Sequence, residues 1–167
     1  FSSRRRHTRY GTVTGVQTCA LPICFDEIDS TNEEAKRRAA AGERGPLWIS
    51  AGTQTAGRGR RGREWVSPVG NLMATLLLSP GASPQLSASL SFVAALAVHD
   101  AVSRWVAPEA VRVKWPNDVL IEGRKTSGIL LESASTSDAA KLPWLAIGIG
   151  INLVSAPALA NYPATFV

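Results

Sequence analysis

Apolar positions recur along the chain in short runs of the length that β-strands favour, and two longer stretches are typical of helices. Glycine, proline or small polar residues bound most of these runs, as they do at the ends of secondary structure. The predicted strands are 25–29, 46–52, 71–79, 111–121 with a break at Pro116, 126–135 and 144–153. The tetrapeptide at 122–125 predicts a hairpin turn between two of them.

The first predicted helix begins at Ser30 or Thr31. Either residue can cap the helix, and Glu33 or Glu34 follows three residues later, so the pattern predicts a capping box in one register or the other. Basic residues follow toward Gly42, where we expect the helix to end.

The second predicted helix covers about 84–106. Serines and charged residues interrupt its apolar positions, which favours a buried helix over a membrane span. Several strands with only two helices predict an α+β fold, in which helices flank a mixed, largely antiparallel sheet. A chain of 167 residues is long enough for one such domain with a core of its own.

Charge separates residues 1–24 from the rest of the chain. The formal net charge of +5 suggests a polyanionic partner at first sight. Four of the 18 lysines and arginines lie in residues 1–24, which leaves 14 basic against 13 acidic side chains in the remainder. The segment lacks periodicity and resembles the conceptual translation of a sequencing adapter, so we exclude it from the fold. The nearly neutral remainder disfavours a nucleic-acid partner.

Both cysteines, Cys19 and Cys24, fall in this excluded segment. With no second Cys/His pair to complete a zinc site, the two cysteines predict neither a zinc site nor a disulfide. A remainder without cysteine, secretion signal or long apolar run predicts a cytoplasmic protein with no membrane partner.

Residues 53–65, "TQTAGRGRRGREW", form what we call the arginine loop. Glycines weaken regular structure and arginines repel one another, so the run suits an anionic ligand, and without one we expect it to be mobile. Gly57, Gly59 and Gly62 match G-x-G-x-x-G, but the flanking sequence fits no dinucleotide fold. The arginines still match phosphate and carboxylate geometry. A solvated surface loop is the alternative.

A second polar cluster follows at the predicted strand break. Lys114, Asn117 and Asp118 surround a proline that fixes the turn, and Lys125 comes one hairpin later. Each has a structural alternative: Asp118 an Asx turn, Lys125 a turn lysine, and Trp115 a core aromatic. Combined with the arginine loop, they make a cationic site with one carboxylate and no nucleophilic Ser or Cys. Such a set suits nucleotidyl transfer to a carboxylate, where positioning and charge neutralisation carry the reaction.

The motifs "STNEEA", "QTAGRGRRGREW", "VKWPNDVLI", "GRKTSGILLE" and "GIGINL" occur in the order and spacing of biotin–protein ligases. The chain resembles the catalytic domain of that family, whose fold is similar to class II aminoacyl-tRNA synthetases. The resemblance implies that biotin and ATP form biotinyl-5′-AMP. It also implies that a lysine of a biotin carboxyl carrier protein then takes the biotinyl group.

The same resemblance implies site residues. Catalytic roles fall to Lys125, Asp118 and Arg60, and Asp118 is also a candidate Mg²⁺ ligand. The implied biotin-binding set is Ser30, Thr31, Asn32, Gln54, Arg58, Gly59, Arg60, Lys125 and Gly128. The implied set for ATP and the adenylate is Arg60, Arg63, Trp65, Asn117, Lys125 and Asn152. ATP and Mg²⁺ would serve as co-substrate and ion, without a tightly bound cofactor.

Two other functions stay open. A lipoate or octanoate ligase of the same architecture would bind its substrate in a long apolar tunnel. A nucleic-acid-binding module using the arginine loop would show broad, salt-dependent affinity. Because biotin–protein ligases usually carry a small barrel-like domain after the catalytic one, we expect 25–167 to be a catalytic domain truncated at its C terminus.

Overall fold

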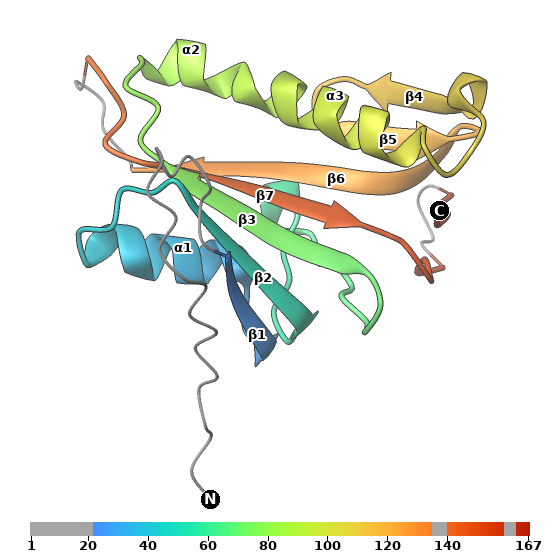
Figure 1. The fold of residues 1–167 in the computed structure, drawn as a ribbon, viewed down its shortest axis with the longest axis horizontal. Helices are drawn as coiled ribbons and strands as arrows, with labels where there is room; N and C mark the ends of the chain where they lie inside the picture. Colours follow the sequence, from blue (N-terminus) through green and yellow to red (C-terminus); the bar gives the residue numbers. More distant parts are fainter. Residues whose placement is uncertain (1–21, 135–139, 159–162) are drawn as a thin grey trace, which may run out of the picture.

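A seven-stranded sheet forms the centre of the molecule, with helices on both of its faces (Figure 1). The computed structural model describes residues 22–134, 140–158 and 163–167; the expectation for residues 1–21 lies outside them. The strands are β1 (Pro22–Ile28), β2 (Leu47–Gln54), β3 (Leu72–Leu78), β4 (Val111–Lys114), β5 (Asp118–Ile121), β6 (Arg124–Ser133) and β7 (Leu145–Ile151).

The strand order in the sheet is β1-β2-β3-β7-β6-β5-β4. Within the described residues only β1 and β2 pair in parallel, and every other neighbouring pair is antiparallel. The predicted mixed, largely antiparallel sheet is therefore confirmed. The hairpin between β5 and β6 is confirmed too: Glu122 and Gly123 have φ of 49° and 77°, which a tight two-residue turn requires.

Each face of the sheet has its own core. Helix α1 (Thr31–Ala40) covers one face, where the buried cluster consists of Ala35, Ala39, Leu47, Ile49, Leu77 and Ala146. Helices α2 (Pro84–Ala88) and α3 (Leu90–Val102) cover the other face, and α3 packs against β4, β5, β6 and β7 (Figure 1). Two 3₁₀ turns, η1 (Arg60–Gly62) and η2 (Pro108–Ala110), complete the secondary structure of the described residues.

Strand β7 alternates isoleucine with glycine, and this decides what each face carries. Successive strand residues point to opposite faces. Ile147 and Ile151 accordingly lie in the core beneath α3. Gly148 and Gly150 point to the face of α1 and the arginine loop, where their missing side chains leave room. One face of β7 is thus filled, and the other is open for a site.

Three local predictions need correction. Strand β1 begins at Pro22, inside the segment excluded from the fold, because its backbone pairs with β2 and Ile23 packs against the α1 core. The capping box at α1 is wrong: Ser30 is the N-cap without a side-chain capping bond, and Glu33 and Glu34 pair with basic side chains instead. The structural alternative for Trp115, a core aromatic, is also wrong, because 76% of this residue is exposed.

The predicted helix at 84–106 is shorter than expected and divides at Ser89 into α2 and α3. Among the described residues, Pro84–Val102 alone is long and apolar enough to span a bilayer, with a mean hydropathy of 1.3. Its inner side chains, Ala94, Ala95, Val98 and Val102, pack on the sheet, whereas Phe92, Val93 and Leu96 are exposed. The buried helix that we predicted is therefore buried on one side only.

Candidate active site

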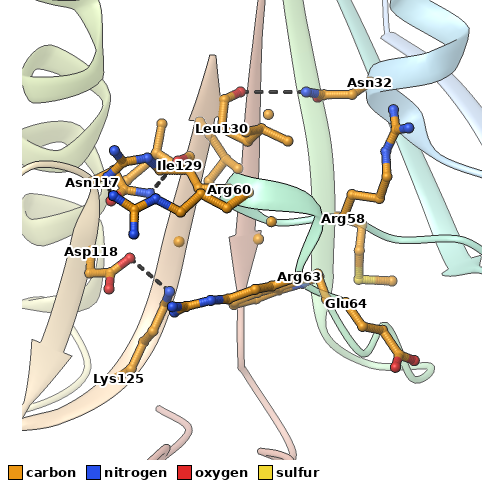
Figure 2. Close-up of a pocket in the computed structure, with 18 of the residues that line it drawn as sticks. Asn32, Arg58, Arg60, Arg63, Glu64, Asn117, Asp118, Lys125, Ile129 and Leu130 are labelled. Atoms are coloured by element: carbon orange, nitrogen blue, oxygen red, sulfur yellow. Dashed lines mark hydrogen bonds and ion pairs between the residues drawn. The ribbon is translucent and has the colours of Figure 1, made fainter. Parts of the chain in front are cut away.

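Every predicted site residue except Asn152 lines one cavity of about 430 Å³. The cavity lies between the start of α1, the arginine loop, the β5–β6 hairpin and β7 (Figure 2). Its volume is in the usual range for a small-molecule site. Side chains more than 90 residues apart in the sequence meet here because β6 and β7 lie beside β3 in the sheet.

Neutral polar side chains form the end of the cavity nearest α1. Gln54 accepts hydrogen bonds at Oε1 from the backbone N–H and the hydroxyl of Thr31, at 2.8 and 3.1 Å. Thr75 donates to Asn32 Oδ1 at 2.6 Å, and Asn32 Nδ2 donates to Glu132 at 2.7 Å. Because these side chains hold one another in place, this end presents fixed neutral donors and acceptors to a ligand.

Thr75 and Glu132 do not line the cavity but hold Asn32 in place, and the sequence reasoning missed both. Thr75 lies on β3 and is fully buried, and Glu132 lies near the end of β6. The signal for Thr75 was a polar residue within the apolar run "LMATLLL". Glu132 gave no comparable signal, since an acidic residue at a strand end is usually solvated.

The Asn32 side chain can pack directly against strand β7 because position 148 is a glycine. A Cβ on Gly148 would collide with Oδ1 of Asn32. The close approach lets the asparagine lie flat on the sheet, within reach of Thr75 and of the Leu130 carbonyl 3.4 Å from Nδ2 (Figure 2).

The arginine loop folds back on itself over the cavity. The Trp65 N–H donates to the Gly57 carbonyl at 2.9 Å, and the Gly59 N–H donates to Arg63 at 2.7 Å. Arg60 donates to Asn117 Oδ1 at 3.0 Å, while Asn117 Nδ2 donates to the Ile129 carbonyl at 2.7 Å. Asn117 therefore connects the loop to β6.

Arg58 points toward α1 and away from Lys125 (Figure 2). Its guanidinium forms an ion pair with Glu33 and lies 3.8 Å from Glu132. The sequence argument considered only repulsion among the arginines. The structure provides carboxylates from the protein itself for one of them.

Lys125 and Asp118 form an ion pair inside the cavity, with Nζ 2.7 Å from Oδ1 (Figure 2). Their side chains are 14% and 22% exposed. The ammonium also lies 5.6 Å from the centre of the Trp65 ring, at the distance of a cation–π contact. A lysine so placed at the β5–β6 hairpin brings a positive charge to the cavity.

Trp65 lies against two glycines of neighbouring strands. Gly128 on β6 and Gly150 on β7 are register partners, and the indole rests on the flat surface that they share. A side chain at either position would enter the space of the ring or of Lys125. The two glycines therefore determine where the end of the arginine loop can lie.

Asn152 lines a smaller depression beside the main cavity, together with Trp65 and Lys125. It is 2% exposed, and its Nδ2 donates to the Thr165 carbonyl at 3.0 Å. Its Oδ1 is buried and has no hydrogen-bond partner among the described residues, so it offers an acceptor at this edge of the site.

Two carboxylates near α1 have depressed pKa values. Burial by itself would raise the pKa of Glu132, but hydrogen bonds from Lys36 and Asn32 and the charges of Lys36 and Arg58 outweigh it and lower the pKa. The hydrogen bond from Arg37 lowers the pKa of Asp29 to about 2. Both groups are therefore anionic at neutral pH.

The described residues contain no group of three His, Cys, Asp or Glu side chains that could hold a metal ion. Asp118, the candidate Mg²⁺ ligand, is paired with Lys125. These side chains do not form a metal site of their own. They fit Mg²⁺ only as an ion that arrives on the phosphates of a nucleotide.

The model of the Biotin/lipoate A/B protein ligase family matches residues 24–152, and the chain belongs to this family.

Its relatives are biotin ligases. The chain is 51% identical over 130 residues to the biotin–[acetyl-CoA-carboxylase] ligase of Paracoccus denitrificans, covering 77% of this chain and 53% of that protein. It is 39% identical over 145 residues to the bifunctional ligase/repressor BirA of Escherichia coli, covering 86% of this chain and 42% of that protein. The chain thus spans about half the length of these relatives.

Solved structures agree with the sequence comparison. The Leishmania major biotin protein ligase in complex with biotinyl-5-AMP superposes with a TM-score of 0.72 at 32% identity, over 87% of this chain and 62% of that one. The Aquifex aeolicus enzyme in complex with biotin and ATP superposes with a TM-score of 0.69 at 33% identity, over 87% and 58%. The predicted fold class is confirmed.

Proposed function

We propose that this chain is the catalytic domain of a biotin–protein ligase, which activates biotin with ATP and transfers it to a lysine of a biotin carboxyl carrier protein. One observation carries the proposal. The Lys125–Asp118 pair, the neutral polar side chains near α1 and the arginine loop all line one cavity. An uncharged ring and an anionic acyl phosphate can therefore bind side by side. The proposed compartment is the cytoplasm, where ATP is available.

In the first step the carboxylate of biotin attacks the α-phosphorus of ATP. A bond forms between a carboxylate oxygen and phosphorus, and the bond to the bridging oxygen breaks as pyrophosphate leaves. Thr31, Asn32 and Gln54 would hold the ureido ring with neutral hydrogen bonds. Lys125 would turn from Asp118 toward the carboxylate and the α-phosphate, where it neutralises charge that develops in the transition state.

In the second step the amine of the carrier lysine attacks the acyl carbon of biotinyl-5′-AMP. An amide bond forms, the bond from the acyl carbon to the phosphate oxygen breaks, and AMP leaves. Asp118 would receive the proton of the incoming ammonium or orient the amine, since it is the carboxylate nearest Lys125. Trp65 would cover the adenine, and Asn152 would offer it the Oδ1 acceptor, which has no hydrogen-bond partner among the described residues.

Mg²⁺ would accompany the triphosphate and reduce its charge as pyrophosphate departs. The arginine loop adds further positive charge, with Arg60 and Arg63 on the lining of the cavity. Closure of the loop would also exclude water from the acyl phosphate, which hydrolyses readily.

The direct test is exchange of labelled pyrophosphate into ATP by this chain. We expect exchange that depends on biotin and not on lipoate or octanoate, because the end of the cavity near α1 is polar rather than an apolar tunnel. Exchange stimulated by lipoate or octanoate in place of biotin would reassign the chain to the lipoate branch of the family. No exchange with any of the three acids would refute the assigned activity for this chain.

A further inference from the structure

Asn71 joins the start of β3 to the part of the chain that leaves β7. Leu72, the first residue of β3, is the register partner of Ile151, the last residue of β7. Just beyond this pair, Oδ1 of Asn71 accepts hydrogen bonds from the backbone N–H groups of residues 153–155, at 3.0, 3.1 and 3.3 Å. Its Nδ2 donates to the carbonyl of Ser155 at 2.9 Å. One buried side chain thus satisfies four backbone groups that β7 can no longer pair.

The turn before β3 places Asn71 against this segment. The Asn71 N–H donates to the Pro68 carbonyl at 3.3 Å, which closes a four-residue turn whose third residue, Gly70, has a φ of 96°. A positive φ at this position is typical of a type II turn and favours glycine. A Cβ on Gly70 would also lie 2.6 Å from Cγ2 of Val154, so the glycine lets the turn pack closely against the segment that Asn71 holds.

That segment supplies one wall of the smaller depression beside the main cavity. Asn152 and Pro157, which flank residues 153–155 in the sequence, both line the depression. Asn152 is fixed from the side of β6 as well, because its N–H donates to the Thr126 carbonyl at 2.8 Å. Asn71 itself lines neither the depression nor the main cavity. Any effect of Asn71 on a ligand must therefore pass through the backbone that it holds.

We propose that Asn71 is a positioning residue for the nucleotide. It fixes the turn at residues 153–155, and the turn fixes the wall against which the adenine half of ATP binds. This role rests on the proposed function, in which Trp65 and Asn152 meet the adenine. The polar end of the cavity near α1 has its own supporting hydrogen bonds, such as that from Thr75, so biotin binding does not depend on Asn71.

The first measurement is hydrogen exchange of the backbone amides of residues 153–155, with no substrate present. Asn71→Leu keeps a side chain of similar size but removes the acceptor, so these amides should exchange about fivefold faster, the usual effect of losing one neutral hydrogen bond. Asn71→Asp keeps an oxygen that can accept from all three N–H groups, and backbone donors of this kind stabilise a carboxylate. Exchange in Asn71→Asp should therefore stay close to that of the wild type.

The second measurement separates nucleotide binding from biotin binding by calorimetry. Asn71→Leu should weaken binding of the unreactive α,β-methylene analogue of ATP, added with Mg²⁺ and biotin, by about tenfold, and Asn71→Asp should restore most of the loss. Biotin alone should bind the wild type and both variants equally. Ser79→Ala is the matched control, because Ser79 follows β3 at its other end and donates to the Pro143 carbonyl at 2.7 Å. It should change neither affinity.

Three outcomes would overturn the proposal. The first is an affinity for the nucleotide analogue that is equal in Asn71→Leu and the wild type. The second is an equal loss of affinity for biotin and for the analogue, which is what a merely structural role of Asn71 predicts. The third is an Asn71→Asp variant that binds the analogue as weakly as Asn71→Leu, because the acceptor oxygen would then have no part in the effect.

The proposed function has a separate test, biotin-dependent pyrophosphate exchange by the wild type. If the wild type shows no such exchange, the proposed function fails, while amide exchange and calorimetry of the variants still decide the role of Asn71. If the wild type is active, Asn71→Leu should raise the KM for ATP about tenfold with little change in kcat, as expected for lost binding that is uniform between ground and transition states. A lower kcat at an unchanged KM for ATP would overturn the positioning role and leave the proposed function intact.

Discussion

Alanine at Gly150 should push the Trp65 indole out of its place, whereas alanine at the neighbouring Gly128 should not. A Cβ built on Gly150 lies 2.5 Å from Trp65 Cε2 and 2.6 Å from both Cζ2 and Nε1. Carbon atoms in contact are normally about 3.5 Å apart or more, so the ring must move by about 1 Å. The strand cannot yield instead, because β7 is paired on both sides, with β3 and with β6.

Gly128 offers a matched comparison in the same sheet and on the same face. A Cβ there lies 3.3 Å from the ring of Trp65 and 3.2 Å from Nζ of Lys125, so a shift of a few tenths of an ångström relieves it. Overpacking of this kind costs about 1–3 kcal/mol when the neighbours are fixed. Trp65 is at the end of a loop and can move, so at position 150 we expect a displaced ring rather than an unfolded protein.

The assay follows the indole N–H resonances of the five tryptophans, with Trp65 assigned by Trp65→Phe. Gly150→Ala should shift the Trp65 resonance strongly and slow biotin-dependent pyrophosphate exchange about 100-fold, as expected for a misplacement of about 1 Å in a catalytic site. Gly128→Ala should produce a small shift and a much smaller loss. An unmoved Trp65 resonance in Gly150→Ala, or a greater effect of Gly128→Ala, would refute this account of the ring.

Four other predictions test separate parts of the site. Lys125→Met should slow biotin-dependent pyrophosphate exchange by about two orders of magnitude, and adding Asp118→Asn should recover stability lost from the unpaired carboxylate but not activity. Thr75→Val should lower the free energy of unfolding by about 1–3 kcal/mol and weaken biotin binding, as measured by calorimetry, because it leaves buried Asn32 Oδ1 without its donor; Thr75→Ser should lose much less. Glu132 has a lowered pKa in the folded state, so its carboxylate stabilises the folded protein above its ordinary pKa of about 4.5, and this stabilisation is lost as pH falls through the lowered pKa. The free energy of unfolding of Glu132→Gln should therefore depend less on pH in the acid range than that of the wild type. Biotin with ATP should slow trypsin cleavage at Arg60, Arg61 and Arg63, and equal cleavage with and without these ligands would contradict ligand-dependent ordering of the loop.

Local features of the fold could be read from the sequence because their causes are local. The glycine at position 123 allows a tight turn, and runs such as "PLWISAG" can only be short strands. The same holds for the motifs of the arginine loop and of residues 114–118, which carry the family resemblance. Of the fourteen site residues predicted from these motifs, thirteen line one cavity.

Contacts between residues far apart in the chain could not be predicted from the sequence. The alternating isoleucines and glycines of β7 are plain in the sequence, but only the strand order decides that the glycines face α1 and the arginine loop. Likewise, Ser30 has the composition of a capping residue, yet Glu33 turns to Arg58 and Lys36 once the loop and β6 are in place.

The hydrogen-bond partners of Asn32 could not be predicted from the sequence either. Thr75 and Glu132 lie 43 and 100 residues after Asn32, and no periodicity relates positions so far apart. They meet because β3, β7 and β6 are adjacent in the sheet and because a glycine at position 148 lets Asn32 approach the backbone. Residue chemistry therefore predicted the kind of ligand, whereas the packing of the sheet decided which side chains hold the predicted ligand-binding groups in place.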